Sequence, residues 1–409
     1  MRPAVTYVLL LFATQAYPQD YSLLRKVREE LRTISAMPDT SARKAELDKW
    51  WNHLIEQKLI PLAVEDSAIF FYRGEAKTVT WTGDFNAWGY VRDYKSKGTR
   101  VPGTDVWLLK ASFPKDARLD YKIVVNNSDR ILDPENPFQQ WSGLGGGSPN
   151  SELRMPAWRE DPILKPIPGI PHGTLRKDIL FSSKTLRYQI TYSVYQPAGA
   201  EHGKKLPVLY VMDGHEYLLP ELGNMATILD NLIGEKKIEP IIVVLVDHRE
   251  PANRSNNRRM EELNMSAKYL NFFTNEFMPA IEKKYPIQAE AAHRAILGSS
   301  IGGLTSAYFI FSRPDLFSMA GMQSPAFWSR PQIYSLCDSA TKANLPKMKI
   351  SLSSGLINDA SEGSRKIKDI LQNSACVYHY RETNEGSSWG NWRNSIDDVL
   401  LDLFGSNNR

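Results

Sequence analysis

The sequence predicts an α/β protein whose largely parallel sheet is preceded by a small all-β sandwich. Two observations predict the parallel sheet. Strands alternate with helices from about residue 175 onward, and runs such as 241–246 are apolar throughout, as in strands buried on both faces. A third observation predicts the sandwich: between about 60 and 158, short β-branched and aromatic runs alternate with Gly, Asp and Asn. We therefore expect two consecutive domains.

The length and composition are those of an ordinary globular protein. The chain has 409 residues, 42% of them hydrophobic and 23% charged, with a formal net charge of +4. A chain of this length is expected to form two or three domains. The charge is small and no basic cluster is interleaved with aromatic residues, so nucleic-acid binding has no support.

The first residues are typical of a secretory signal. Met1-Arg2 precedes an apolar run at 8–13, and small residues close the segment at Ala16, which predicts a signal peptide over 1–16. A buried N-terminal helix is the alternative. No later apolar run reaches the roughly 20 residues of a membrane span. We expect an exported protein, periplasmic or secreted, without a membrane span.

The segment 20–58 is expected to be helical, because apolar residues recur at the spacing of an amphipathic helix. They form two runs: Leu23, Leu24, Val27, Leu31 and Ile34, then Leu47, Trp50, Trp51 and Leu54. A packed helical hairpin is the simplest interpretation.

The sandwich is expected over 60–158 and the α/β domain over 175–405. The strands predicted for the sandwich are 68–73, 78–81, 106–110 and 119–125, and those for the α/β domain are 190–195, 208–212, 241–246, 295–297, 349–353 and 377–380. Helices are expected over 267–284 and 303–312. A proline-rich stretch at 162–171 is typical of a linker.

The most informative motif is Gly298-Ser299-Ser300-Ile301-Gly302, which fits the pattern G-x-S-x-G. It lies between a predicted strand and a predicted helix, the context in which this pattern forms a nucleophile elbow. The sharp turn would raise the Ser300 hydroxyl above the sheet. The amide of Ile301, at the helix N-terminus, would then donate to an oxyanion. Ser299 is interpreted as a turn residue.

A second oxyanion donor is expected from the loop that follows the strand 208–212. This loop reads Asp213-Gly214-His215, in which Gly214 permits a tight turn. We assign the donor to the backbone amide of His215. An ordinary strand-to-helix turn is the alternative.

Several separated motifs, in order, resemble the enterochelin esterase family. They are Asp213-Gly214, the elbow through Leu304, Arg313–Phe317, Gln323–Trp328 and Asn384–Arg393. Upstream, Trp81–Trp88 and Asp133–Pro137 resemble the early-set, immunoglobulin-like β-sandwich that precedes the hydrolase domain in that family. The resemblance covers about 60–405 and implies an α/β-hydrolase fold.

The resemblance also implies a reaction. The family hydrolyses esters with a Ser-Asp/Glu-His triad, and several members act on the lactone backbone of catecholate siderophores, while related feruloyl esterases share the layout. The implied partner is a small-molecule or glycan-linked ester. The sequence shows neither metal-ligand spacing nor a phosphate loop, so no metal and no cofactor are expected. The oligomeric state stays open.

The triad acid and base are expected after Ser300 in the chain. Asp359, after a late strand, is the acid candidate, with a solvated turn residue as the alternative. The family's histidine motif resembles Glu-Gly-His-x-Trp, but here the segment 385–389 reads Glu-Gly-Ser-Ser-Trp, so Ser387 replaces the histidine. His379 is the one histidine beyond Asp359, and its place inside a strand puts it about 10 Å below the site.

A serine hydroxyl cannot act as a base near neutral pH, whereas an imidazole titrates there. Two explanations stay open. His215 or His248, both expected at the rim of the site, could be a surrogate base. Alternatively, Ser387 is an inactivating substitution, natural or engineered. The two functional hypotheses are thus an exported serine esterase with impaired activity, and an inactive pseudoenzyme that binds a siderophore or a feruloylated glycan.

Four further residues are substrate-binding candidates. Arg249 and Arg254 follow the C-terminal end of a strand, where open α/β sheets bind ligands, and could hold an anionic group. Trp328 and Trp389 could stack on an aromatic ring. The alternatives are solvated loop charges for the arginines and core packing for the tryptophans. The cysteines, Cys337 and Cys376, could form one disulfide or remain buried thiols.

Overall fold

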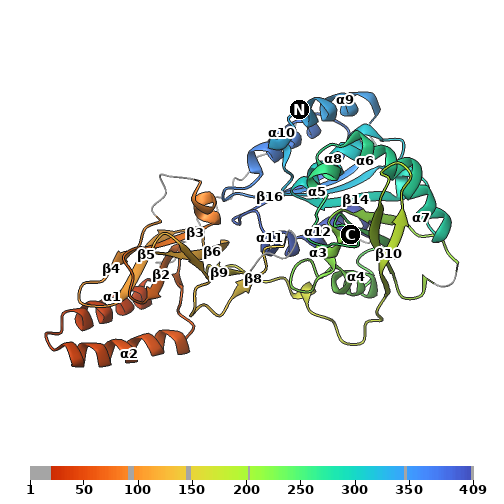
Figure 1. Ribbon diagram of the computed structural model, residues 1–409. Coiled ribbons are helices and arrows are strands. Elements are labelled where there is room, and N and C mark those ends of the chain that lie inside the picture. Colours follow the sequence, from red (N-terminus) through yellow and green to blue (C-terminus); the bar gives the residue numbers. More distant parts are fainter. Residues whose placement is uncertain (1–19, 91–95, 144–148, 201–202, 345–347, 407–409) are drawn as a thin grey trace, which may run out of the picture.

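The computed structural model describes residues 20–90, 96–143, 149–200, 203–344 and 348–406. The predicted signal peptide, 1–16, lies outside these ranges. Figure 1 shows two units side by side: a smaller one with two sheets and a helical pair, and a larger one around an eight-stranded sheet. Within the described ranges, none of the helices has the length and apolar character needed to cross a membrane.

The N-terminal helices form the predicted hairpin, α1 (Ser22–Ser35) and α2 (Thr40–Glu56). Asp39 caps α2 by accepting a hydrogen bond from the amide of Ala42 (2.7 Å), which satisfies one of the free N–H groups of the first turn. Apolar side chains of both helices pack against Ile69, Phe71 and Val106 of the first sheet. The hairpin therefore covers the outer face of that sheet.

The two-sheet unit, residues 62–154, consists of two antiparallel sheets. The first has the order β1-β2-β5-β4, and the second β3-β6-β9-β8 with β7 beside β6. The strands are β1 (Leu62–Val64), β2 (Ser67–Arg73), β3 (Val79–Gly83), β4 (Thr99–Arg100), β5 (Val106–Ser112), β6 (Arg118–Val125), β7 (Asp129–Ile131), β8 (Gln139–Gln140) and β9 (Asn150–Arg154).

The inner faces of these two sheets share one apolar core. Phe70 of β2 contacts the ring of Tyr121 of β6 edge to face, with 4.9 Å between ring centroids. Trp81 and Phe85 are buried in the same core, and they pack rather than face solvent. The indole of Trp88 donates to Asp84 (3.1 Å).

The eight-stranded sheet has the order β10-β11-β13-β12-β14-β15-β16-β17 and is parallel from β13 to β17. Its strands are β10 (Thr174–Ser182), β11 (Gln189–Gln196), β12 (Val208–Val211), β13 (Ile242–Asp247), β14 (Arg294–Ser299), β15 (Met319–Gln323), β16 (Lys349–Gly355) and β17 (Val377–Thr383). The strands β12, β13 and β14 are buried on both faces, as predicted from their apolar runs.

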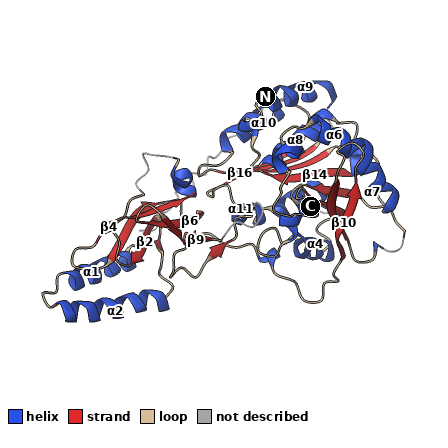
Figure 2. Ribbon diagram, in the orientation of Figure 1, coloured by secondary structure: helices blue, strands red, loops and turns tan. Residues whose placement is uncertain are grey.

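Helices cover both faces of this sheet (Figure 2). One apolar cluster lies under α6 (Ala267–Phe272), α7 (Met278–Lys284), α8 (Ile301–Ser312), α9 (Gln332–Asn344) and α10 (Ser361–Leu371). The other lies under α3 (Gly214–Leu218), α4 (Met225–Gly234), α11 (Trp389–Arg393) and α12 (Ile396–Phe404). A short helix α5 (Arg259–Leu263) follows β13. This three-layer α/β arrangement agrees with the predicted class.

Two strands of the sheet were not predicted. The strand β15 reads Met-Ala-Gly-Met-Gln, without a β-branched or aromatic residue, so its propensity is weak although every residue is buried. The strand β10 is a largely exposed edge strand that carries Arg176, Lys177 and Asp178. Such charges prevent an edge strand from pairing with another chain, and they also interrupt the alternation of apolar residues by which a strand is predicted.

Candidate functional site

The backbone at Ser300 forms the predicted sharp turn between β14 and α8. Ser300 has φ 54° and ψ −117°, a conformation that a non-glycine residue adopts only where its surroundings enforce it. Its amide donates to the carbonyl of Gln323 (2.8 Å), and its carbonyl accepts from the amide of Ala326 (2.9 Å). A Cβ at Gly298 would lie 2.4 Å from the carbonyl carbon of Gly302, so the turn closes only with glycine there. The Ser300 side chain is half-buried.

The two backbone amides predicted as oxyanion donors both lie at helix starts. Ile301 is the first residue of α8 and His215 the second of α3, so both N–H groups belong to first turns, where the helix itself supplies no acceptor. Asp213 is left-handed at φ 54°, and a Cβ at Gly214 would lie 2.4 Å from Cβ of Leu245. The Asp213-Gly214 turn therefore requires its glycine.

A buried arginine ties the α3 turn to the elbow. Nε of Arg259 donates to Oδ2 of Asp213 (2.8 Å), and its Nη2 donates to the carbonyl of Ser299 (3.2 Å). Asp213 Oδ2 would also lie 3.3 Å from a Cβ at Gly302. The turn with His215 and the start of α8 are thus neighbours, as an oxyanion pocket requires.

Asp359 lies beyond the end of β16, on the same edge of the sheet as Ser300. Its Oδ2 accepts from Oγ of Ser324 (2.5 Å) and from the amide of Gly355 (2.7 Å). Burial raises the pKa of Asp359, and these donors and the nearby hydroxyl of Ser387 oppose that rise. Position 387 is thus close to the acid candidate.

Ser387 is exposed, between buried neighbours on the segment that leads from β17 into α11. The structure brings Ser387 close to Asp359, and the side chain at position 387 is a hydroxyl. A hydroxyl donates to the carboxylate but cannot take the proton of Ser300 near neutral pH.

His379 lies far from this edge, as predicted. It pairs with Ser351 across β16 and β17, four residues before the pair Gly355–Thr383 that ends the ladder, which is roughly 13 Å along the strand. Its Nδ1 is 3.5 Å from Oδ1 of Asp402 on α12.

The two histidines considered as surrogate bases both lie beside carboxylates. Nδ1 of His215 is 3.3 Å from Oδ1 of Asp247, at the end of β13. Since β13 and β14 flank β12 on opposite sides, Asp247 and Ser300 follow strands on opposite sides of β12. His248, the residue that follows β13, is fully buried, and its Nδ1 is 2.6 Å from Oε2 of Glu262. It lies at the predicted end of the strand, but its ring is already bound to a carboxylate.

The two arginines predicted to bind substrate both contact Asp247. Arg249 donates to both carboxylate oxygens (3.0 and 2.9 Å), and Arg254 donates to Oδ2 (2.7 Å) and to Asp178 (3.1 Å). Burial tends to raise the pKa of Asp247, but the bonds from Arg249 and the approach of His215 hold it below its usual value. The arginines therefore already have anionic partners within the chain.

The two tryptophans predicted to stack on substrate differ in their exposure to solvent. Trp328 is 77% exposed and can stack on a ligand. Trp389 is fully buried, its Nε1 donates to Oε2 of Glu216 (2.8 Å), and its ring contacts Tyr217 and Trp392. The prediction that Trp389 stacks on substrate is corrected: the ring belongs to the core, which was the alternative.

Sequence reasoning missed a buried charge cluster beside Ser387. Arg118 on β6 is fully buried among Asp120, Glu152 and Glu385. The available signal was charge in an otherwise apolar strand, 118–125.

The two cysteines, Cys337 and Cys376, are both buried and free. Of the two alternatives left open by the sequence, the structure therefore shows buried thiols and not a disulfide.

The cluster predicts a pH dependence of stability. Burial is the main cause that raises the pKa of Glu385 to about 7. A carboxyl with a raised folded-state pKa stabilises the fold below its unfolded value, near 4.3, and that contribution is lost as pH rises through 7. We expect the free energy of unfolding to fall by about 2–3 kcal/mol from this group between pH 4.5 and 8.

Urea unfolding at a series of pH values measures how the free energy of unfolding changes with pH. The variant Glu385→Gln has no titratable group at this position, so its free energy of unfolding should change less with pH. Asp84, whose pKa is raised to about 8 chiefly by burial, supplies part of the remaining slope. Equal slopes for the wild type and the variant would contradict the assignment.

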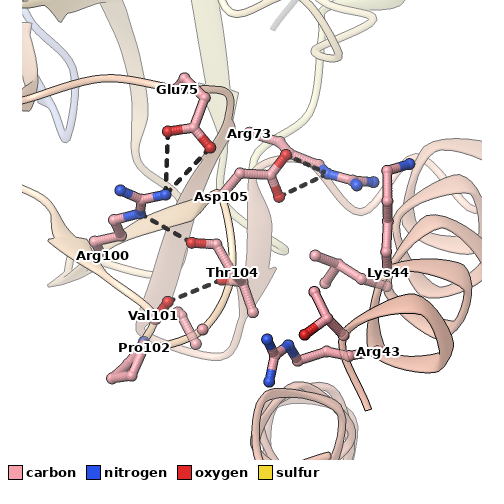
Figure 3. A pocket seen from close by; sticks show the side chains of 12 residues that line it. Arg43, Lys44, Arg73, Glu75, Arg100, Val101, Pro102, Thr104 and Asp105 are labelled. Carbon is pink, nitrogen blue, oxygen red and sulfur yellow. Dashed lines mark hydrogen bonds and ion pairs between the residues drawn. The ribbon is translucent and has the colours of Figure 1, made fainter.

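A hollow of about 530 Å³ lies between α2 and the first sheet (Figure 3). Each of its basic side chains already has a partner within the chain: Arg73 binds Asp105 and Asp48, Arg100 binds Glu75, Lys44 binds Asp48, and Arg43 donates to the carbonyl of Met37. We assign it no ligand.

Comparison with known proteins assigns the chain to a family. Residues 183–403, more than half of the chain, match the family model described as "Putative esterase". Among curated proteins, the uncharacterized protein YjcH of Bacillus subtilis is 24% identical over 241 residues, which are 57% of this chain and 98% of that protein. The endo-1,4-beta-xylanase/feruloyl esterase of Xylanibacter ruminicola is 29% identical over 235 residues, 54% of this chain and 30% of that protein.

Solved structures extend the likeness beyond the matched range. The ferric enterobactin esterase of Salmonella typhimurium superposes with a TM-score of 0.69 at 18% identity, covering 82% of this chain and 93% of that chain. The enterobactin esterase of Shigella flexneri gives 0.67 at 20% identity, covering 82% and 92%. The resemblance predicted from the separated motifs is thereby confirmed for the fold.

Proposed function

Because the chain belongs to the esterase family, we propose that its site is built to hydrolyse carboxylic esters through Ser300, and that activity is impaired by the serine at position 387. Ser300 would attack the ester carbonyl, and the amides of Ile301 and His215 would stabilise the oxyanion. Asp359 would orient the base. The observation that carries this proposal is the strained elbow at Ser300, which opens a helix at the same sheet edge as Asp359.

The proposed substrate class is siderophore lactones or feruloyl-type esters. It is supported by the names of the similar proteins, which include enterobactin esterases and a feruloyl esterase. Exposed Trp328 fits an aromatic acyl group. We further propose an early-set, immunoglobulin-like domain over 60–158, an esterase domain over 175–405, and export to the periplasm or medium through the signal peptide at 1–16.

A second candidate function is favoured by one observation, the hydroxyl at position 387 beside Asp359. In this reading the chain is a pseudoenzyme that binds such esters in the same cleft without turnover.

Steady-state hydrolysis of p-nitrophenyl acetate and methyl ferulate tests the proposal, with Ser300→Ala as the matched control. We expect slow turnover that disappears in Ser300→Ala, together with covalent labelling of Ser300 by a fluorophosphonate. Equal rates for both proteins, without labelling, would reject the esterase and leave the pseudoenzyme, which calorimetry with the same esters would then detect as binding.

A further inference from the structure

The two units meet at the segment 384–391, which follows β17 and includes the first turns of α11; Figures 1 and 2 show α11 at the junction. A parallel β-bridge pairs Arg118 of β6 with Glu385, and the amide of Arg118 donates to the carbonyl of Asn384 (3.3 Å). Asn384 also donates through its side chain to Asp116 (2.8 Å). The segment is thus attached to the edge of the two-sheet unit.

We propose that Arg118 is a positioning residue, which fixes the 384–391 segment and with it position 387 relative to Asp359. This inference rests on the proposed function, in which position 387 is the place of the general base. Nη1 of Arg118 donates to Oγ of Ser388 (2.9 Å) and lies 3.8 Å from Oε2 of Glu385. One guanidinium therefore contacts residues on both sides of Ser387, which itself stays exposed.

The direction of this guanidinium is set by the sheet beneath it. Its Nη2 donates to Asp120 (2.5 Å) and its Nε donates to Glu152 of β9. A guanidinium is a planar fork with fixed donor directions. With two of its edges held by carboxylates, Nη1 points toward Ser388, and β6 sets the place of the segment.

Two glycines let the segment approach these charges. A Cβ at Gly390 would lie 1.9 Å from Cζ of Arg118, and one at Gly386 would lie 2.3 Å from Cγ of Asp84. Any other residue would push the backbone away from the two-sheet unit. The close packing on both sides of Ser387 leaves that position little room to shift from Asp359.

A purely structural role makes a different prediction. If Arg118 only stabilised the fold, its loss would lower the melting temperature while leaving the chemistry of the folded protein unchanged. If it positions the segment, local opening at 384–391 would rise and kcat would fall at temperatures where the protein is folded.

The experiment has two readouts, and the first does not depend on activity. Amide hydrogen exchange is measured in wild type, Ser388→Ala and Arg118→Met. We expect exchange in 384–391 to rise about tenfold in Ser388→Ala and more in Arg118→Met, since a hydrogen bond to a charged group is lost, while β14 keeps its protection. Ser388→Ala leaves the charges of the cluster paired, so it keeps the test valid if Arg118→Met does not fold.

The second readout uses Ser387→His as the background for kinetics. Adding Ser388→Ala should lower kcat for p-nitrophenyl acetate about tenfold with KM unchanged. Arg73→Met is the control, because Arg73 is a half-buried arginine of the two-sheet unit that also binds two carboxylates, Asp48 and Asp105 (Figure 3). It does not touch the segment, so neither readout should change.

The outcomes separate the two proposals. Exchange in 384–391 that matches the Arg73→Met control in both variants would overturn the positioning role. If exchange rises but Ser387→His hydrolyses no ester, Arg118 does fix the segment and it is the proposed esterase function that fails. Unchanged kcat in Ser387→His/Ser388→Ala, despite faster exchange, would also overturn the role in positioning the base.

Discussion

Ser387→His is expected to raise ester hydrolysis on the order of 10³-fold, because a general base in contact with its acid contributes 10²–10⁴-fold to such reactions. Position 387 lies near Asp359, so the new imidazole would be within reach of the carboxylate that orients the base in a triad. The gain should appear in kcat rather than KM, since the change supplies proton transfer and leaves the binding cleft as it is. Hydrolysis of p-nitrophenyl acetate and methyl ferulate measures it.

The controls for this gain lie in the same site. Ser300→Ala in the Ser387→His background should abolish the gain, and Asp359→Asn should remove most of it by leaving the imidazole unoriented. The rate should also rise with pH around the pKa of the new histidine, near 6.5 when unperturbed. A wild type that is already fast, with no gain from Ser387→His, would show that another base works with Ser300.

Trp389→Ala is expected to lower the free energy of unfolding by about 3–5 kcal/mol. The indole is fully buried and packs against Tyr217 and Trp392. Its loss leaves a cavity and removes one hydrogen bond to the carboxylate of Glu216. Denaturant unfolding followed by circular dichroism measures the change.

Trp328→Ala is the matched comparison. Because Trp328 is 77% exposed, its removal should change stability by less than about 0.5 kcal/mol, while raising KM for an aromatic ester such as methyl ferulate. Similar stability losses in the two variants would contradict the assignment of Trp389 to the core and Trp328 to the surface.

Strong local patterns made much of the fold predictable. The apolar run 241–246 became β13, shifted by one residue, and the periodic runs in 20–58 became α1 and α2. The strands that were missed had no such pattern. β15 is built of small and flexible residues and is a strand because β14 and β16 flank it, a tertiary effect that propensity does not contain.

The candidate site was predictable where it depends on backbone shape. Gly298 and Gly214 lie in turns that leave no room for a side chain, so the backbone positions of Ser300 and of the His215 amide could be predicted from the motifs alone. The directions of side chains could not be predicted in this way, because they depend on which strands are neighbours in the sheet. His215 faces Asp247 because β13 adjoins β12, and Trp389 is buried because α11 covers the sheet.

The buried contacts of the 384–391 segment also bear on how the protein melts. Arg118, Asp84 and Trp158 of the N-terminal part contact Ser388, Gly386 and Glu385 respectively. If either unit unfolded alone, the other would lose these contacts, which raises the free energy of partial unfolding. We therefore expect the two units to unfold as a single cooperative block, and calorimetry should record one heat-absorption peak for the chain rather than two.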